Sequence, residues 1–142
     1  MFKVLVDLNV VLDVLLDRPS LGPTSTQLLV LVDQKRLEGW LCASSIDTLD
    51  YLLRRSLKRD PLPHIRTLRE ILRIAPVDEA VIDAALNLGW GDLEDAIVHE
   101  SARLSGLHAI VTRNTRNFAR ATLPVLTPEQ FLDAHQGLTP SP

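Results

Sequence analysis

Carboxylates recur in this chain just after short apolar runs, where a parallel α/β sheet exposes the ends of its strands. Asp7 ends the apolar run that begins at Phe2, Asp47 lies shortly after a second run, and Asp92 and Asp95 open a later helical pattern. A carboxylate at the end of a buried strand is expensive to desolvate unless it is paired or bound to a cation. Carboxylates that converge on one site favour a divalent cation, and oxygen ligands select Mg²⁺ or Mn²⁺ rather than zinc. Such a cation is suited to phosphodiester hydrolysis, because it activates water and neutralises phosphate charge.

Each of these acids also has a purely structural interpretation. Asp7 can accept backbone N–H groups of the following helix, and Asp92 with Asp95 fits the N-cap and third position of a capping box. Asp47 can compensate the positive end of a helix dipole. His99, one turn beyond Asp95, is more typical of a core or surface histidine than of a ligand. The chemistry therefore depends on whether the fold brings the acids together.

Short apolar runs alternate with helical patterns, which predicts βαβ units and a parallel sheet. Strands are expected at Phe2–Asp7, Gly39–Cys42, Arg73–Ala75, His108–Thr112 and Pro124–Leu126. Helices are expected from the cap Asn9 to Asp17, and at Pro23–Arg36, Ser44–Arg59, Pro63–Leu72, Glu79–Leu88, Leu93–Ser105 and Pro128–His135. Because sites in open parallel sheets lie at the carboxyl ends of strands, we expect one beside Asp7 and Thr112.

The length of 142 residues and the hydrophobic content of 46% fit one globular domain, expected over residues 1–136, with a flexible tail at 137–142. A lone Cys42 excludes a disulfide framework and a cysteine-type zinc site. Acids at Asp7, Asp13 and Asp17 are incompatible with the apolar core of a signal peptide, and no apolar run is long enough to cross a membrane. We therefore expect a cytoplasmic protein with no membrane partner.

The formal net charge of −3 argues against nucleic-acid binding by overall charge, but the charges are unevenly distributed. Seven basic residues cluster in one segment: Arg54, Arg55, Lys58, Arg59, Arg66, Arg69 and Arg73. The segment from Asp78 to Ala102 contains acids and neither Lys nor Arg. This pattern fits a basic surface for a phosphate backbone beside an acidic cation site, or two solvated helix faces.

Five segments resemble, in order, the motifs of PIN domains. Val6–Asp13 (VDLNVVLD) is similar to the family's opening Asp-Thr-Asn-Val-Leu-Leu-Asp, and Ala43–Arg55 is similar to the helix after its second strand. Asp92–Ala96 (DLEDA) resembles the acidic motif that opens a later helix. Ile110–Phe118 resembles the closing Thr-Arg-Asn and Asp-Phe motif, and Leu126–Leu132 the C-terminal signature. The resemblance covers nearly the whole chain.

The resemblance implies a Rossmann-like three-layer α/β/α domain with a five-stranded parallel sheet, and a Mg²⁺- or Mn²⁺-dependent endoribonuclease. Many small bacterial members are VapC-type toxins, which usually form homodimers and are blocked by an antitoxin peptide. Carried over motif by motif, Asp7 and Asp95 are the metal ligands, and Asp92 is the less constant acid before Asp95. Asn9 and Thr112 match the polar residues that support the site.

Two positions depart from the family pattern. The family's helix Glu falls within Asp47–Asp50, where Asp47 would substitute with a shorter reach and Thr48 would not substitute. The family's last acid is Asn117 here, which keeps a carbonyl oxygen but loses a negative charge. A site with fewer charges should hold its cation more weakly.

Two functions therefore compete. The first is an active endoribonuclease that uses Asp7, Asp95, Asp92 and Asp47, with the RNA backbone held by Arg54, Arg55, Arg113 and Arg116. The second is a catalytically impaired PIN domain that binds RNA or a protein partner. Other Rossmann-like enzymes fit less well: a dinucleotide-binding protein needs a glycine-rich first turn, and a haloacid-dehalogenase-like phosphatase needs an acid where Asn9 stands.

Overall fold

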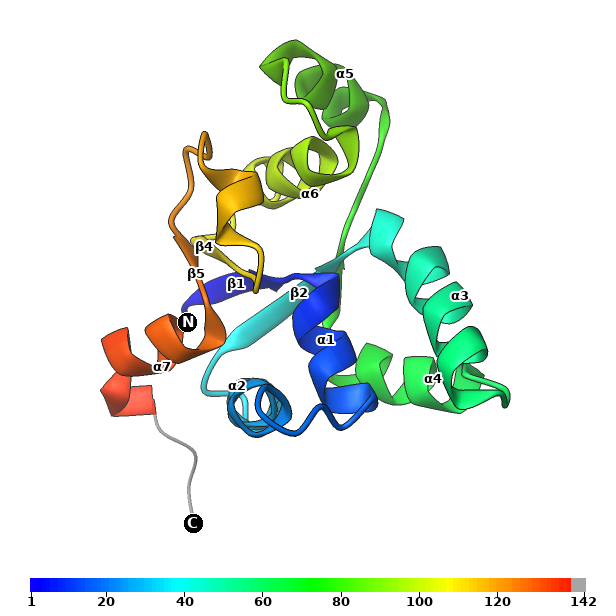
Figure 1. Ribbon diagram of the computed structural model, residues 1–142. Coiled ribbons are helices and arrows are strands. Elements are labelled where there is room, and N and C mark those ends of the chain that lie inside the picture. The colour runs from blue at the N-terminus through cyan, green and yellow to red at the C-terminus, as the bar shows by residue number, and fades with distance from the viewer. Residues whose placement is uncertain (139–142) are drawn as a thin grey trace.

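A five-stranded parallel sheet with helices on both faces forms the centre of the molecule (Figure 1). The computed structural model describes residues 1–138. Its strands are β1 (Lys3–Val6), β2 (Glu38–Cys42), β3 (Arg73–Ala75), β4 (Ala109–Val111) and β5 (Val125–Leu126). They lie in the order β3-β2-β1-β4-β5, so β1 is central and all four pairings are parallel. The predicted three-layer α/β fold with five parallel strands is confirmed.

Seven α-helices connect or follow these strands. They are α1 (Leu8–Leu15), α2 (Gly22–Asp33), α3 (Ile46–Leu57), α4 (Leu62–Ile71), α5 (Glu79–Leu88), α6 (Leu93–Leu104) and α7 (Pro128–Ala134). Three short 3-10 helices, η1 (Ala43–Ser45), η2 (Thr115–Phe118) and η3 (Gln136–Leu138), complete the described chain. No helix within residues 1–138 is long and apolar enough to span a membrane.

Side chains along the central strands point alternately to the two faces of the sheet, and this divides the core into two layers. Val4 and Val6 of β1 pack into a cluster with α1, α2, α3, α4 and α7, while Leu5 between them joins a second cluster with α6. β4 repeats the pattern, with Ile110 in the second cluster and its neighbours in the first. Because successive strand side chains point to opposite faces, this alternation places helices on both sides of the sheet (Figure 1).

Gly39 of β2 allows two apolar side chains to approach the sheet closely. A Cβ at this position would lie 2.7 Å from Cδ2 of Leu72 and 2.9 Å from Cγ2 of Val32. Glycine is therefore needed here for packing rather than for backbone freedom.

The structure differs from the predicted elements mainly at their ends. Asp7, not Asn9, is the N-cap of α1, and its carboxylate accepts the N–H of Leu8. The three 3-10 helices were not expected, since such short turns have no sequence period of their own. Of the predicted flexible tail, Gly137 and Leu138 belong to η3, and 139–142 lie outside the described residues.

Candidate active site

A polar cavity of about 230 Å³ lies at the carboxyl ends of β1 and β4, where the switch in strand order predicts a site. Four acidic side chains, three amide side chains and two leucines line it: Asp7, Asp92, Glu94 and Asp95, then Asn9, Asn114 and Asn117, and Leu8 and Leu12. Of the site residues expected from sequence, the fold brings together Asp7, Asn9, Asp92, Asp95 and Asn117. We call this the acid cavity.

Asp7 is held at the base of the acid cavity by hydrogen bonds to both of its carboxylate oxygens. Oδ1 accepts the N–H of Leu8 at 2.8 Å, and Oδ2 accepts the hydroxyl of Thr112 at 2.7 Å. Burial nevertheless raises the pKa of Asp7, although these two hydrogen bonds oppose the rise. The carboxylate therefore has a fixed orientation but incomplete compensation of its charge.

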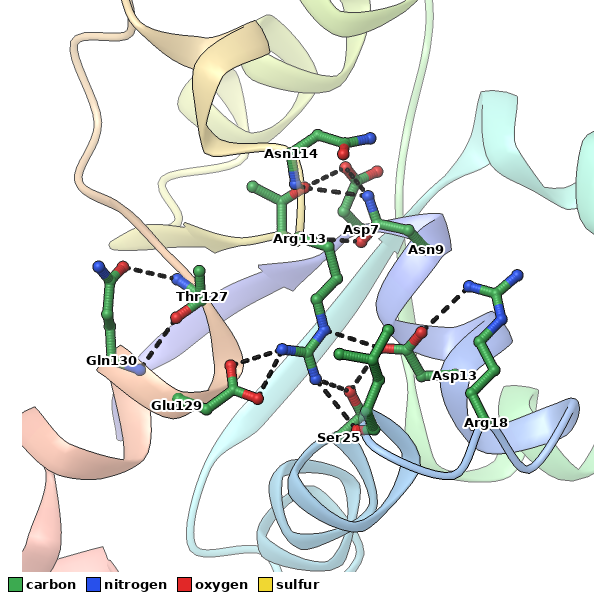
Figure 2. A network of polar contacts seen from close by, with 12 residues as sticks. Asp7, Asn9, Asp13, Arg18, Ser25, Arg113, Asn114, Thr127, Glu129 and Gln130 are labelled. Atoms are coloured by element: carbon green, nitrogen blue, oxygen red, sulfur yellow. Dashed lines mark hydrogen bonds and ion pairs between the residues drawn. The ribbon is translucent and has the colours of Figure 1, made fainter.

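Thr112 and Asn9 support Asp7 from neighbouring positions, and Figure 2 shows Asn9 beside Asp7. The fully buried Thr112 hydroxyl donates to Asp7 and accepts N–H groups from Asn114 at 3.1 Å and from the Asn9 amide at 3.2 Å. These three bonds use the whole capacity of a hydroxyl. The other end of the Asn9 side chain accepts the backbone N–H of Arg113 at 3.0 Å. The predicted supporting positions of Asn9 and Thr112 are therefore built into the hydrogen bonding of Asp7.

Asp95 comes from the first turn of α6, on the other side of the acid cavity from β1. Asp92 caps this helix by accepting the backbone N–H of Asp95 at 3.1 Å, so the capping interpretation of Asp92 holds alongside its place in the cavity. Oδ2 of Asp95 is buried and makes no hydrogen bond within residues 1–138. A buried carboxylate oxygen without a partner is costly, which marks it as a position for a ligand.

The pKa of Asp95 shows how its charge is destabilised. Burial is the largest cause that raises this pKa from 3.8 to about 6. The negative charges of Asp92, Asp7 and Glu94 contribute in that order, whereas a hydrogen bond with Asn117 opposes the rise. Acidic groups that interact in this way across a cavity gain most from a shared cation.

The donor set fits a hard divalent cation. Asp7 and Asp95 offer carboxylate oxygens, and Asn117 on η2 lines the cavity beside them. Within residues 1–138, no three His, Cys, Asp or Glu side chains already gather as a metal site. A cation here would therefore rely on two carboxylates supplemented by amide or water oxygens, as Mg²⁺ often does.

Arg113 differs from its sequence expectation as an RNA-binding residue. Its five guanidinium N–H groups all have partners within the protein: Asp13, both carboxylate oxygens of Glu129, the Leu21 carbonyl and the Ser25 hydroxyl (Figure 2). Asp13 is fully buried, and a buried carboxylate needs a partner of opposite charge. The main role of Arg113 is therefore to neutralise the Asp13 carboxylate. Arg113 is therefore not available for a phosphate.

Three other expected residues lie away from the acid cavity. Asp47 is an exposed residue in the first turn of α3, where its charge favours the positive end of the helix. Arg54 and Arg55 lie in the last turn of the same helix and bond to Asp50 and Tyr51. The fold does not bring these residues to the acids, because α3 carries its charged residues on its outer face.

His99 is a core residue, in agreement with its structural interpretation. Its Nε2 accepts the N–H of Thr122 at 3.1 Å, so the proton lies on Nδ1, which donates to Glu100 at 3.0 Å. Burial lowers the pKa of His99. The histidine holds the chain after η2 against α6 and has no place in the acid cavity.

Comparison of the sequence with known families identifies the class of protein to which this fold and this acid cavity belong. Residues 3–116 match the PIN domain family, and the chain belongs to this family. Ribonuclease VapC1 of Aquifex aeolicus (strain VF5) is 29% identical over 136 residues, which cover 92% of this chain and 94% of the relative.

Solved structures show the same fold. A toxin–antitoxin complex from Klebsiella pneumoniae superposes with a TM-score of 0.67 at 21% identity, over 88% of this chain and 97% of that one. FitAcB from Neisseria gonorrhoeae has a TM-score of 0.63 at 24% identity, over 89% of this chain and 98% of that one. VapBC2 from Rickettsia felis, bound to a DNA fragment from its promoter, has a TM-score of 0.65 at 16% identity, over 88% of this chain and 97% of that one.

Proposed function

We propose that this chain is a metal-dependent endoribonuclease that hydrolyses RNA phosphodiesters. The observation that carries the proposal is the acid cavity, which Asp7 and Asp95 both line and where Oδ2 of Asp95 is buried without a hydrogen-bond partner among the described residues. Family membership and the similarity to a ribonuclease support the same activity.

Asp7 and Asp95 would hold Mg²⁺ or Mn²⁺, with an amide oxygen of Asn117 beside them. When bound, such a cation polarises the phosphate and lowers the pKa of water. Thr112 and Asn9 fix the orientation of the Asp7 carboxylate through their hydrogen bonds. Asp92 contributes negative charge and holds the first turn of α6 in place.

Cleavage of a mixed set of structured RNAs by the wild type, Asp7→Asn and Asp83→Asn tests the activity. Asparagine caps a helix as well as aspartate does, so Asp7→Asn removes the charge and keeps the cap of α1. Asp83 is an exposed acid on α5 and serves as the matched control. We expect cleavage by the wild type and Asp83→Asn with Mn²⁺ or Mg²⁺, and none with EDTA or by Asp7→Asn.

Undiminished cleavage by Asp7→Asn would exclude the acid cavity as the active site. If no metal supports cleavage by any of the three proteins, the alternative gains support: an impaired PIN domain that binds RNA or a protein. That alternative rests on Asn117, which replaces an acid, and on Asp47, which lies outside the cavity.

We also propose that the chain is the toxin of a toxin–antitoxin pair and forms a homodimer. The similar solved structures from Klebsiella pneumoniae and Rickettsia felis are described as a toxin–antitoxin complex and VapBC2, which supports an antitoxin partner. Growth arrest on expression, relieved by co-expression of the adjacent gene and abolished by Asp7→Asn, tests the toxin assignment. Light scattering of the purified chain tests the dimer.

A further inference from the structure

A second cavity adjoins the acid cavity and contains the aromatic and basic groups that the acid cavity lacks. It measures about 110 Å³ and is lined by Trp90, Gly91, Asp92, Arg116, Asn117, Ala119 and Arg120. Asp92 and Asn117 line both cavities, so the two share a wall. We call it the tryptophan cavity.

Arg116 and Arg120 bring positive charge to the cavity that adjoins the acids. The acid cavity itself has no basic lining residue, although four carboxylates surround it. Of the arginines beside it, Arg113 is fully engaged by internal partners. Arg116 is exposed, and its guanidinium makes no hydrogen bond or ion pair within residues 1–138, while Arg120 has only a 3.5 Å hydrogen bond to the Gly89 carbonyl. A polyanion that approaches four carboxylates needs such positive charge beside them.

Trp90 provides an aromatic surface at the same place. The indole is half-buried and is held by the His99 ring at 5.1 Å and by the edge of the Phe118 ring at 6.1 Å. His99 is itself fixed by Glu100 and Thr122, so the indole rests on a rigid base. Gly91, the next lining residue, has open space where a Cβ would be. A rigid, partly open indole is a surface on which an unpaired base can stack.

From this arrangement we propose that the tryptophan cavity binds one nucleotide of single-stranded RNA beside the bond that is cut. Arg116 and Arg120 contact the backbone phosphate, because guanidinium groups match phosphate oxygens in geometry and charge. Trp90 stacks on the base of that nucleotide. The inference rests on the proposed ribonuclease function and adds the preference for an unpaired nucleotide at this position.

Fluorescence of Trp90 tests the site directly. The chain has two tryptophans, and Trp40 lies in β2 beneath Arg73, so Trp40→Phe leaves Trp90 as the only reporter. Asp7→Asn in the same protein prevents cleavage during the titration. We expect a short unstructured oligoribonucleotide to quench Trp90, and the same sequence in a duplex to leave it unquenched.

Arg116→Gln with Arg120→Gln, added to this protein, should weaken binding by about tenfold or more, because it removes both guanidinium groups that contact the phosphate. The slope of log affinity against log salt should fall by about 0.7, because the neutralisation of one phosphate of a single strand contributes about 0.7. Lys35→Gln, after α2, removes one positive charge from an exposed residue that lines neither cavity, and should change neither value. Trp90→Ala, whose folding is checked by circular dichroism, should weaken binding by about tenfold.

The inference would be overturned if unpaired RNA did not quench Trp90. It would also be overturned if the variant without the two arginines kept the same quenching and the same salt slope. The outcome is separable from that of the proposed function. Metal-dependent cleavage without Trp90 quenching leaves the ribonuclease intact and removes this subsite. Quenching that needs Arg116 and Arg120, in a protein that cleaves no RNA, leaves the subsite and removes the ribonuclease.

Discussion

The side-chain oxygen of Asn9 accepts the backbone N–H of Arg113 at 3.0 Å, across 104 positions of sequence. This bond joins the start of α1 to the loop after β4. The backbone of Arg113 thus bonds to a residue that lines the acid cavity, while its side chain reaches Asp13, Ser25 and Glu129 (Figure 2). One residue therefore couples the supports of Asp7 to α2 and α7.

Arg113→Ala should lower the free energy of unfolding by about 3–5 kcal/mol, because it leaves the buried Asp13 charge without its main partner. Arg18→Ala removes the other cation beside Asp13, but this arginine side chain is 40% exposed and the loss should be about 1 kcal/mol or less. Denaturant unfolding of both variants measures the difference. Equal losses would show that Arg113 has no special part in compensating Asp13.

Thr112→Val should weaken Mn²⁺ binding by about tenfold, as the loss of a residue that orients a metal ligand typically does. Valine keeps the volume but removes the hydroxyl that donates to Asp7, so the pKa of Asp7 should rise further. Calorimetric titration with Mn²⁺ measures the affinity. Thr67→Val, at an exposed threonine on α4, is the matched control and should bind Mn²⁺ as the wild type does.

Asp95→Asn should stabilise the metal-free protein at neutral pH by about 1 kcal/mol, a value reduced for solvent screening. The pKa of Asp95 is raised in the folded state, so the fold holds its proton more tightly than the unfolded chain does. Wild-type stability from this group is therefore full below 3.8 and is lost as the pH rises to about 6. Unfolding in EDTA across this range measures the effect. A variant that follows the wild-type pH profile would contradict the assigned pKa.

Asn117→Asp should tighten Mn²⁺ binding by about tenfold, because a third carboxylate adds charge to an oxygen-ligand site. Without metal, the same substitution should raise the pKa of Asp95 and lower stability at neutral pH. Titration and unfolding in EDTA test the two effects together. Unchanged Mn²⁺ affinity would place Asn117 outside the metal site.

The fold could be predicted from the sequence because the patterns that indicate its strands and helices are local. Each strand from Phe2 to Leu126 is a short apolar run, and β3 and α5 have the bounds that periodicity predicts. The N-cap of α1 was predicted wrongly as Asn9, since both Asp7 and Asn9 are good capping residues. Only the tertiary bond from Asn9 to Arg113 decides between them.

The candidate site was only partly accessible from sequence. Asp7 and Asp95 follow from motif and strand position, but the use of Arg113 depends on the burial of Asp13, which no local pattern reveals. Arg54 and Arg55 look like a phosphate surface in sequence, yet α3 directs them to its own Asp50 and Tyr51. Trp90 and Arg120 carry no motif, and only their proximity to Asn117 shows their relevance.

The pairing of β1 with β4 has a consequence during synthesis on the ribosome. The Thr112 hydroxyl that orients Asp7 is made 105 positions after it, and Asn117 follows later still. A growing chain therefore carries its acids long before it can arrange them, since distant segments meet only after β4 has emerged and docked. Translation can thus make the segment from Asp7 to Asp95 in an inert form, and the cavity assembles only once β4 and η2 have followed.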